Sequence, residues 1–198
     1  MTEARASDRV MTIPNLVSFV RLLTIPVFWW VLLVEDNVPV AAWIVFIVGW
    51  TDWIDGFLAR RLDQVSEVGK VLDPVADRLM IASALVGGLI AGVLPVWFGW
   101  GLIGREVLVA GLALYLAARG GGTIEVRWLG KAATFALYGA IPAFYLAAAG
   151  VAEWLMEPTA WFFGMLGLVL YWYVAVLYVG DSRAKLAALE SAPDTEEV

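Results

Sequence analysis

The sequence predicts an all-α integral membrane protein with six transmembrane helices, from its composition, its apolar segments and the placement of its basic residues. Hydrophobic residues fill 62% of the 198 positions and charged residues only 16%, and the mean hydropathy is +0.81. Soluble domains are about half apolar and about a quarter charged. A chain this apolar needs a lipid environment, where backbone polar groups must be satisfied within the chain, as they are in helices.

Six apolar segments follow one another, each close to the ~20 residues that a helix needs to cross a bilayer. They run over residues 16–34, 38–58, 71–92, 94–118, 131–150 and 159–180. The alternation of apolar and polar residues that marks a membrane β-barrel is missing. A short juxtamembrane amphipathic segment, DRVMTIPNLVSF, leads into the first span, and we expect Pro14 to separate the two.

The domain organisation is predicted to be simple. We expect one membrane domain over residues 1–185. The remaining residues, 186–198, include the acidic stretch SAPDTEEV, which is typical of a solvated, disordered tail. Charges gather in the second and third spans and are not echoed in the fifth and sixth, so no internal repeat of the transporter kind is visible.

Basic residues lie in alternate connections. Arg and Lys occur before the first span, between the second and third, between the fourth and fifth, and after the sixth. The other three connections, around 35–37, 91–95 and 151–158, contain neither residue. The positive-inside rule therefore predicts that both termini and the 59–70 loop are cytoplasmic.

The residue types that are missing limit the chemistry. The chain has no Cys and no His. This excludes disulfides, thiolate nucleophiles and Cys-bound metals, and it removes the side chain that most often serves as a base at neutral pH. Polar chemistry must come from carboxylates, Arg, Lys and the backbone.

Four aspartates stand out in the stretch DWIDGFLARRLDQVSEVGKVLDPVAD. Asp52 and Asp55 are three residues apart at the cytoplasmic end of the second span, so they share a helix face. Asp73 and Asp77 are four apart at the start of the third span and also share a face. Pro74 is tolerated there if it lies in the first helical turn. The short loop between the spans brings the two pairs together near the cytoplasmic surface.

Four converging carboxylates repel one another unless a cation joins them. A cluster of hard oxygen ligands suits Mg²⁺, Mn²⁺ or Ca²⁺, and two such ions can hold a phosphoryl centre from both sides. Gly56 and Gly69 leave space for a ligand, and Arg60 is placed to bind a phosphate. The alternative is that the aspartates only pair with neighbouring basic residues. Those residues are Arg60, Arg61, Lys70 and Arg78.

This stretch fits the pattern D-x2-D-G-x2-A-R-x8-G-x3-D-x3-D, and the sequence resembles the CDP-alcohol phosphotransferase family on that ground. Every fixed position matches, namely Asp52, Asp55, Gly56, Ala59, Arg60, Gly69, Asp73 and Asp77. The stretch TIPNLVSFVRLLTIP is similar to the opening of bacterial phosphatidylglycerophosphate and cardiolipin synthases. GREVLV and WLGKAATF are similar to their fourth and fifth spans, so the resemblance covers most of the chain.

The resemblance implies a reaction and its residues. An alcohol would attack the β-phosphorus of CDP-diacylglycerol and release CMP, with Mg²⁺ or Mn²⁺, as two ions, as cofactor. Asp52, Asp55 and Asp73 would bind metal. Asp77 would bind metal and act as general base. The remaining matched positions would hold or make room for the CDP-lipid, which Asp52 also touches. They are Asn15, Leu16, Val17, Ser18, Gly56, Ala59, Arg60, Ser66 and Gly69.

The acceptor is left open between two glycerol compounds. Arg105, Lys131 and Arg183 would bind it, and the alternatives are an Arg105–Glu106 salt bridge and lysine and arginine heads that reach the membrane surface. Glycerol-3-phosphate enzymes of the family often read G-K-x-K-T, whereas this chain reads GKAAT, with Ala133 in place of the second Lys. Glycerol-3-phosphate is placed first as the commoner acceptor and phosphatidylglycerol nearly level. Inositol phosphate is disfavoured.

Two other classes of membrane protein use acidic clusters. A cation transporter would place its carboxylates near the bilayer midplane, and the spacing here does not resemble that of intramembrane prenyltransferases. The family resemblance implies instead an enzyme of the bacterial plasma membrane with a cytoplasmic active site, and a homodimer.

Overall fold

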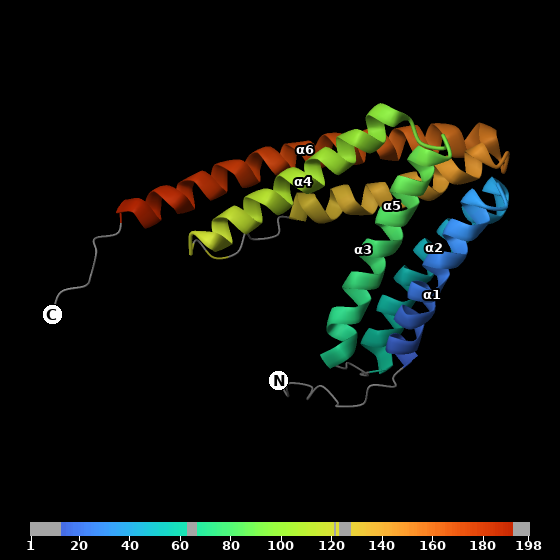
Figure 1. Ribbon diagram of the computed structural model, residues 1–198, viewed down its shortest axis with the longest axis horizontal. Helices are drawn as coiled ribbons and strands as arrows, with labels where there is room; N and C mark the ends of the chain where they lie inside the picture. Colours follow the sequence, from blue (N-terminus) through green and yellow to red (C-terminus); the bar gives the residue numbers. More distant parts are fainter. Residues whose placement is uncertain (1–12, 63–66, 121, 123–127, 192–198) are drawn as a thin grey trace. The chain divides into compact units, whose positions relative to one another are not determined.

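The computed structural model describes residues 13–62, 67–120, 122 and 128–191 (Figure 1). Within these ranges the side chains of residues 13–15, 52–62, 67–71, 73, 74 and 188–191 are outside the description. The described residues form helices and no strands, which confirms the predicted all-α class. The helices are α1 (Ile13–Leu33), α2 (Val38–Leu62), α3 (Glu67–Ile90), α4 (Val96–Ala118), α5 (Trp128–Ala148) and α6 (Glu153–Ser191).

Each helix covers one of the predicted apolar segments. Helix α1 begins at Ile13, so Pro14 lies in its first turn, where a proline removes no helical hydrogen bond. Residues 8–12 of the predicted amphipathic segment lie outside the described residues. Helix α3 begins at Glu67, so Pro74 lies inside the helix and not in its first turn. Residues 67–70 therefore extend α3 before position 71, where the predicted apolar segment begins.

Among the described residues, three helices are long and apolar enough to cross a bilayer. Their spanning stretches are Leu16–Leu33, Val96–Ala118 and Glu153–Ala187, with mean hydropathies of 2.0, 1.6 and 2.0. Helix α2 adds a shorter apolar stretch, Val38–Thr51. Large apolar side chains such as Leu23, Trp30 and Val107 are more than half exposed. Apolar surface on this scale is suited to lipid, and the chain is a membrane protein.

The chain divides into two compact units. The first comprises Met1–Val96 and Tyr138–Trp161, and the second comprises Trp97–Leu137 and Phe162–Val198. Helices α5 and α6 each contribute to both units.

In the first unit, α1 packs against both α2 and α3 (Figure 1). The core gathers apolar side chains from these helices and from the second half of α5, with Phe28, Leu32 and Tyr145 almost fully buried. The hydroxyl of Tyr145 donates a hydrogen bond to the carbonyl oxygen of Ala84 at 2.8 Å. This bond satisfies the one polar atom that the tyrosine brings into the core.

A glycine allows the close approach of α3 to α1. A Cβ atom at Gly87 would lie 2.8 Å from Cδ2 of Leu32 and 3.0 Å from the ring of Phe28. Small residues let membrane helices approach closely. The turn between α1 and α2 is set by Asn37, whose side-chain oxygen accepts the backbone N–H of Val40 at 3.1 Å and caps α2.

In the second unit, α6 contacts both α4 and the first half of α5. The indole N–H of Trp172 donates to the carbonyl oxygen of Gly101 at 3.1 Å. A Cβ atom at Gly130 would lie 3.6 Å from Val174 and from the Tyr178 hydroxyl. Helix α6 is longer than its apolar segment and runs on to Ser191. The first part of the predicted tail is therefore helical, and residues 192–198 lie outside the described chain.

Candidate active site

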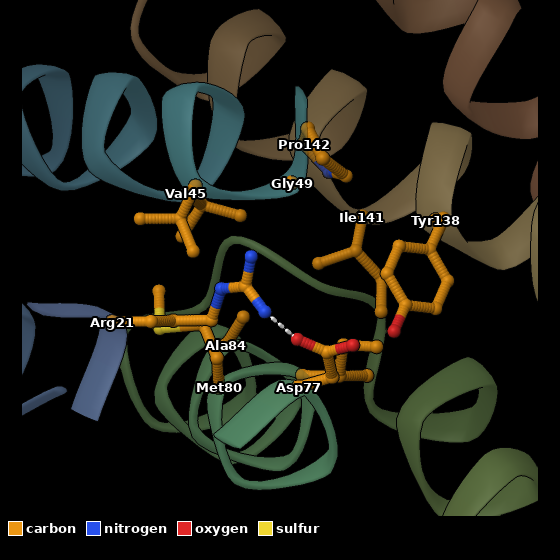
Figure 2. A pocket seen from close by; sticks show the side chains of 11 residues that line it. Arg21, Val45, Gly49, Asp77, Met80, Ala84, Tyr138, Ile141 and Pro142 are labelled. Atoms are coloured by element: carbon orange, nitrogen blue, oxygen red, sulfur yellow. Dashed lines mark hydrogen bonds and ion pairs between the residues drawn. The ribbon is translucent and has the colours of Figure 1, made fainter. Parts of the chain in front are cut away.

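A pocket opens between α1, α2, α3 and α5 in the first unit (Figure 2). Its empty volume is about 400 Å³, part of which is open to solvent. Most of its wall is apolar, and its ionised groups belong to two residues, one on α1 and one on α3. The lining residues are Arg21, Val45, Val48, Gly49, Asp77, Met80, Ile81, Ala84, Tyr138, Ile141 and Pro142.

Arg21 and Asp77 form an ion pair across the pocket (Figure 2). Nη1 of the arginine donates a hydrogen bond to Oδ1 of the aspartate. The Arg21 side chain is 3% exposed and that of Asp77 is 19% exposed. A guanidinium this deeply buried needs a compensating charge, and the packing of α1 against α3 supplies the carboxylate. One of the four predicted aspartates is therefore placed at the polar end of an apolar pocket.

Tyr138 completes this end of the pocket. Its ring lies on the α5 side and directs the hydroxyl toward the side on which Asp77 lies (Figure 2). Val45 and Gly49 of α2 line the opposite wall. A hydroxyl and a carboxylate beside an apolar cavity suit a ligand with a polar head and an apolar body.

The other predicted metal ligands are placed only by their backbones. Asp52 and Asp55 lie in α2, and Asp73 lies one turn before Asp77 in α3. The helices therefore give the spacing that puts each pair on one face. The three carboxylates themselves lie outside the described side chains, and among the side chains that are described no group of three or more potential ligands occurs. The four-carboxylate cluster stays a prediction.

The predicted nucleotide contacts are described in part. On α1, Leu16 is exposed, Val17 is half-buried and Ser18 is fully buried. Ser18 lies three residues before Arg21 and so shares its helix face. The side chains of the remaining contacts lie outside the description, and Ser66 lies outside it entirely. Those remaining contacts are Asn15, Gly56, Ala59, Arg60 and Gly69.

Arg105, a predicted acceptor ligand, is held within the second unit. Its Nη1 donates to Oε1 of Glu106 at 3.0 Å, and its Nε donates to the backbone oxygen of Tyr171 at 3.4 Å. Its guanidinium lies 3.6 Å from the centroid of the Tyr171 ring. The Tyr171 hydroxyl also donates to Glu106. The salt bridge weighed as the alternative is present within α4, and the contacts with Tyr171 link α4 to α6. Acceptor binding by Arg105 stays a prediction.

The other residues of the acceptor hypothesis differ in exposure. Lys131 in the first turn of α5 and Arg183 near the end of α6 are exposed. Ala133, where the lysine of G-K-x-K-T would stand, is fully buried. A Cβ atom at Gly167 would lie 2.9 Å from Leu137 and 3.3 Å from the backbone oxygen of Ala133. The backbones of α5 and α6 therefore approach closely at Ala133, within the second unit.

Arg21 is the site residue that the sequence analysis did not single out. It lies inside the first apolar segment, 16–34, so it belongs to none of the connections used to assign orientation. The signal that identifies it is simple, because an ionisable residue inside an apolar span is uncommon and usually has a functional partner.

Comparison with known proteins identifies the family. The family model for CDP-alcohol phosphatidyltransferases matches residues 11–173 of the chain. The chain belongs to the CDP-alcohol phosphatidyltransferase family. This confirms the resemblance drawn from the aspartate pattern, and it makes the chain a transferase of phospholipid biosynthesis.

Relatives of the phosphatidyltransferase fall into two groups by name. Cardiolipin synthase (CMP-forming) of Streptomyces coelicolor is 39% identical over 188 residues, which cover 92% of this chain and 87% of that protein. The CDP-diacylglycerol–glycerol-3-phosphate 3-phosphatidyltransferase of Bacillus subtilis is 34% identical over 151 residues, or 69% of this chain and 78% of that protein. The enzyme of the same name from Shigella flexneri is 33% identical over 189 residues, or 88% and 96%.

Proposed function

We propose that the enzyme transfers the phosphatidyl group of CDP-diacylglycerol to phosphatidylglycerol and so forms cardiolipin. An acceptor hydroxyl oxygen forms a bond to the β-phosphorus of the donor while the bond from that phosphorus to CMP breaks. The hydroxyl proton passes to a carboxylate base. CMP leaves with the electron pair of the broken bond.

The burial of Ala133 is the observation that favours this acceptor. A second lysine at this position, as in the pattern frequent among the glycerol-3-phosphate enzymes, would add a cation for a small dianionic acceptor. Here the position is filled by a methyl group that is 0% exposed, and the α6 backbone approaches the Ala133 backbone closely at Gly167. Phosphatidylglycerol carries less charge than glycerol-3-phosphate and needs fewer cations. The similarity to the Streptomyces cardiolipin synthase agrees with this choice.

Glycerol-3-phosphate is the second candidate acceptor. Two relatives are named for it, and Lys131 keeps the first lysine of the G-K-x-K-T pattern. Together with Arg105 and Arg183, Lys131 would then bind the acceptor phosphate.

The aspartates of α2 and α3 fit a divalent metal. Their oxygens are the ligand type that Mg²⁺ and Mn²⁺ prefer, and Asp77 already accepts a cationic partner in the pocket. In this proposal Asp52, Asp55, Asp73 and Asp77 hold two ions. When bound, the metal would stabilise negative charge on the diphosphate and on the leaving CMP.

Asp77 is the general base in this proposal. Its carboxylate faces a pocket whose wall is mostly apolar, where an acceptor hydroxyl can approach it. The CDP-lipid would be held by the predicted contacts on α1, α2 and the start of α3. The apolar wall toward Met80 and Ile141 would accept the lipid part of a substrate.

The membrane arrangement follows from the distribution of basic residues. All six helices would span the plasma membrane of a bacterium, with both termini and the active site on the cytoplasmic side. We also propose a homodimer, as the family resemblance implies.

A paired assay tests the acceptor. Purified enzyme in mixed micelles receives CDP-diacylglycerol and Mg²⁺ or Mn²⁺, with phosphatidylglycerol in one sample and glycerol-3-phosphate in the other. CMP release and the lipid product are measured. Cardiolipin formed only in the first sample supports the proposal. Phosphatidylglycerophosphate formed only in the second establishes the second candidate instead, and product in neither would overturn both.

A further inference from the structure

Packing of the first unit does not by itself require the Arg21–Asp77 ion pair. Replacing a buried ion pair by apolar side chains of similar volume is often neutral or stabilising, because both charges lose their hydration on burial. The first unit already has an extensive apolar core around Phe28 and Leu32. Stability alone therefore does not account for an arginine whose side chain is 3% exposed in the middle of an apolar helix.

The geometry of the pair suits the control of one carboxylate. Arg21 contacts Asp77 through Nη1 and a single oxygen, Oδ1. A carboxylate has a second oxygen, which can act on a ligand in the pocket while the first stays bonded. The surrounding wall of Val45, Met80 and Ala84 has few dipoles, so the attraction between the two charges is stronger there than in water.

Charge gives the second reason. Asp77 shares its helix with Asp73 and lies beside the α2 aspartates in the proposed site, so its carboxylate is repelled by like charges until a metal binds. A guanidinium is permanently charged. Arg21 therefore offsets that repulsion without any ligand, and it comes from a different helix.

We propose that Arg21 is a positioning residue for the transfer reaction. It fixes Asp77 through Oδ1, with the other oxygen directed at the acceptor hydroxyl, before metal and substrates arrive. Preorganised groups of this kind lower the barrier rather than tighten substrate binding. The proposal rests on the proposed role of Asp77 as base, and it adds a residue from α1 to a site assigned to α2 and α3.

The first test compares Arg21→Met with Arg21→Lys in full-length enzyme in micelles. Loss of a side chain that orients a metal-binding residue typically lowers activity by about 10–100-fold. We expect Arg21→Met to lower kcat in that range and leave the KM for CDP-diacylglycerol and the Kd for CDP, measured by calorimetry, unchanged. Arg21→Lys keeps the positive charge but lacks the planar guanidinium group, and it should recover part of kcat. Arg78→Met is the matched control, since it removes an exposed cation next to Asp77.

Substrate binding and folding would give different results. If Arg21 bound the diphosphate of the donor, Arg21→Met would weaken CDP binding as much as turnover, and the proposal would be wrong. If it only held α1 to α3, the variant would lose thermal stability and Arg21→Lys would regain stability and kcat together. Should Arg21→Met not fold, the Arg21→Lys enzyme is tested alone. A kcat below that of the wild type with an unchanged Kd for CDP then supports the proposal, and a wild-type kcat contradicts it.

A double-mutant cycle separates this proposal from the role of Asp77. Asp77→Glu keeps a carboxylate but moves it by one methylene. If Arg21 acts through Asp77, Arg21→Met should lower kcat much less in the Asp77→Glu enzyme than in the wild type. Equal losses in both backgrounds overturn the positioning role. Full turnover by Asp77→Asn would instead remove the base assignment itself.

Discussion

The carboxylate of Asp77 meets a guanidinium on one side and a pocket on the other, and these neighbours set what its replacement does. Asp77→Asn keeps the shape and removes the basic oxygen. General base catalysis contributes about 10²–10⁴-fold, so we expect turnover to fall by at least that much while CDP-lipid binding is largely kept. CMP release and calorimetric binding of CDP measure the two effects.

A matched variant controls for the loss of charge. Asp36→Asn makes the same change at an exposed loop residue with φ of 50°, a backbone conformation that asparagine accepts. It should be as active as the wild type. Turnover of Asp77→Asn near the wild-type rate would contradict the base assignment.

Asp55 is predicted to act on metal and nucleotide together. Asp55→Ala should raise the Mg²⁺ or Mn²⁺ concentration needed for half-maximal activity and weaken CDP binding, because a carboxylate that holds the ion also places the diphosphate. A metal titration of activity and of CDP affinity tests this. An unchanged titration curve would count against the aspartate cluster as the metal site.

At this scale the sequence analysis singled out Asp77 among four aspartates but missed the arginine that pairs with it. The aspartates follow a fixed spacing that is visible along one stretch. Arg21 is 56 residues away from Asp77, and only the packing of α1 on α3 brings them together. Likewise, Arg105 could be read as a ligand or a salt bridge, and the neighbour that decides its contacts, Tyr171, comes from another helix.

At the scale of the helices, packing at Gly87 gives a direct test. Gly87→Ala puts a methyl group 2.8 Å from Leu32 and 3.0 Å from the Phe28 ring, and overpacking of a core costs about 1–3 kcal/mol. Gly111→Ala is the control, since nothing lies within 4 Å of that position and alanine is the better helix former. Thermal unfolding in detergent should show Gly87→Ala destabilised and Gly111→Ala not. Equal melting temperatures would mean that α1 and α3 do not need this contact.

The sequence predicted where the helices lie, but it did not predict the residues at which they begin and end. Apolarity located six segments because lipid requires it. The helices continue into polar stretches, which apolarity does not detect. The clearest case is α6, where RAKLAALES after the apolar segment consists mostly of good helix formers. The early start of α3 has the same origin and places Pro74 in the helix interior.

At the scale of the whole molecule, the absence of cysteine makes the orientation easy to test. The natural chain contains no Cys, so each introduced thiol is unique. Asp36→Cys lies between α1 and α2 and should react with a membrane-impermeant maleimide added to intact cells. Ala187→Cys on α6 should react only after the membrane is opened. The reverse pattern would invert the predicted topology, and activity of both variants is the control for folding.

Composition predicted the membrane class, and the resemblance to a known family implied the reaction. The sequence also predicted a single membrane domain, and this stays a prediction. The described helices group into two compact units, and such grouping depends on contacts between distant segments that a sequence does not show. The acceptor is harder to predict for the same reason. In the proposed function it depends on the neighbours of Ala133, which a linear pattern does not contain.

The length of α6 has a consequence for the lipid bilayer itself. Its 39 residues correspond to about 58 Å at 1.5 Å per residue, against a hydrocarbon layer of about 30 Å. Much of the helix must therefore lie outside the hydrocarbon or tilt within it. A thicker bilayer would cover more of its final turns and a thinner one fewer. The acyl-chain length of the surrounding lipid thus determines how far the C-terminal end of α6 extends from the membrane. The enzyme itself helps to supply that lipid.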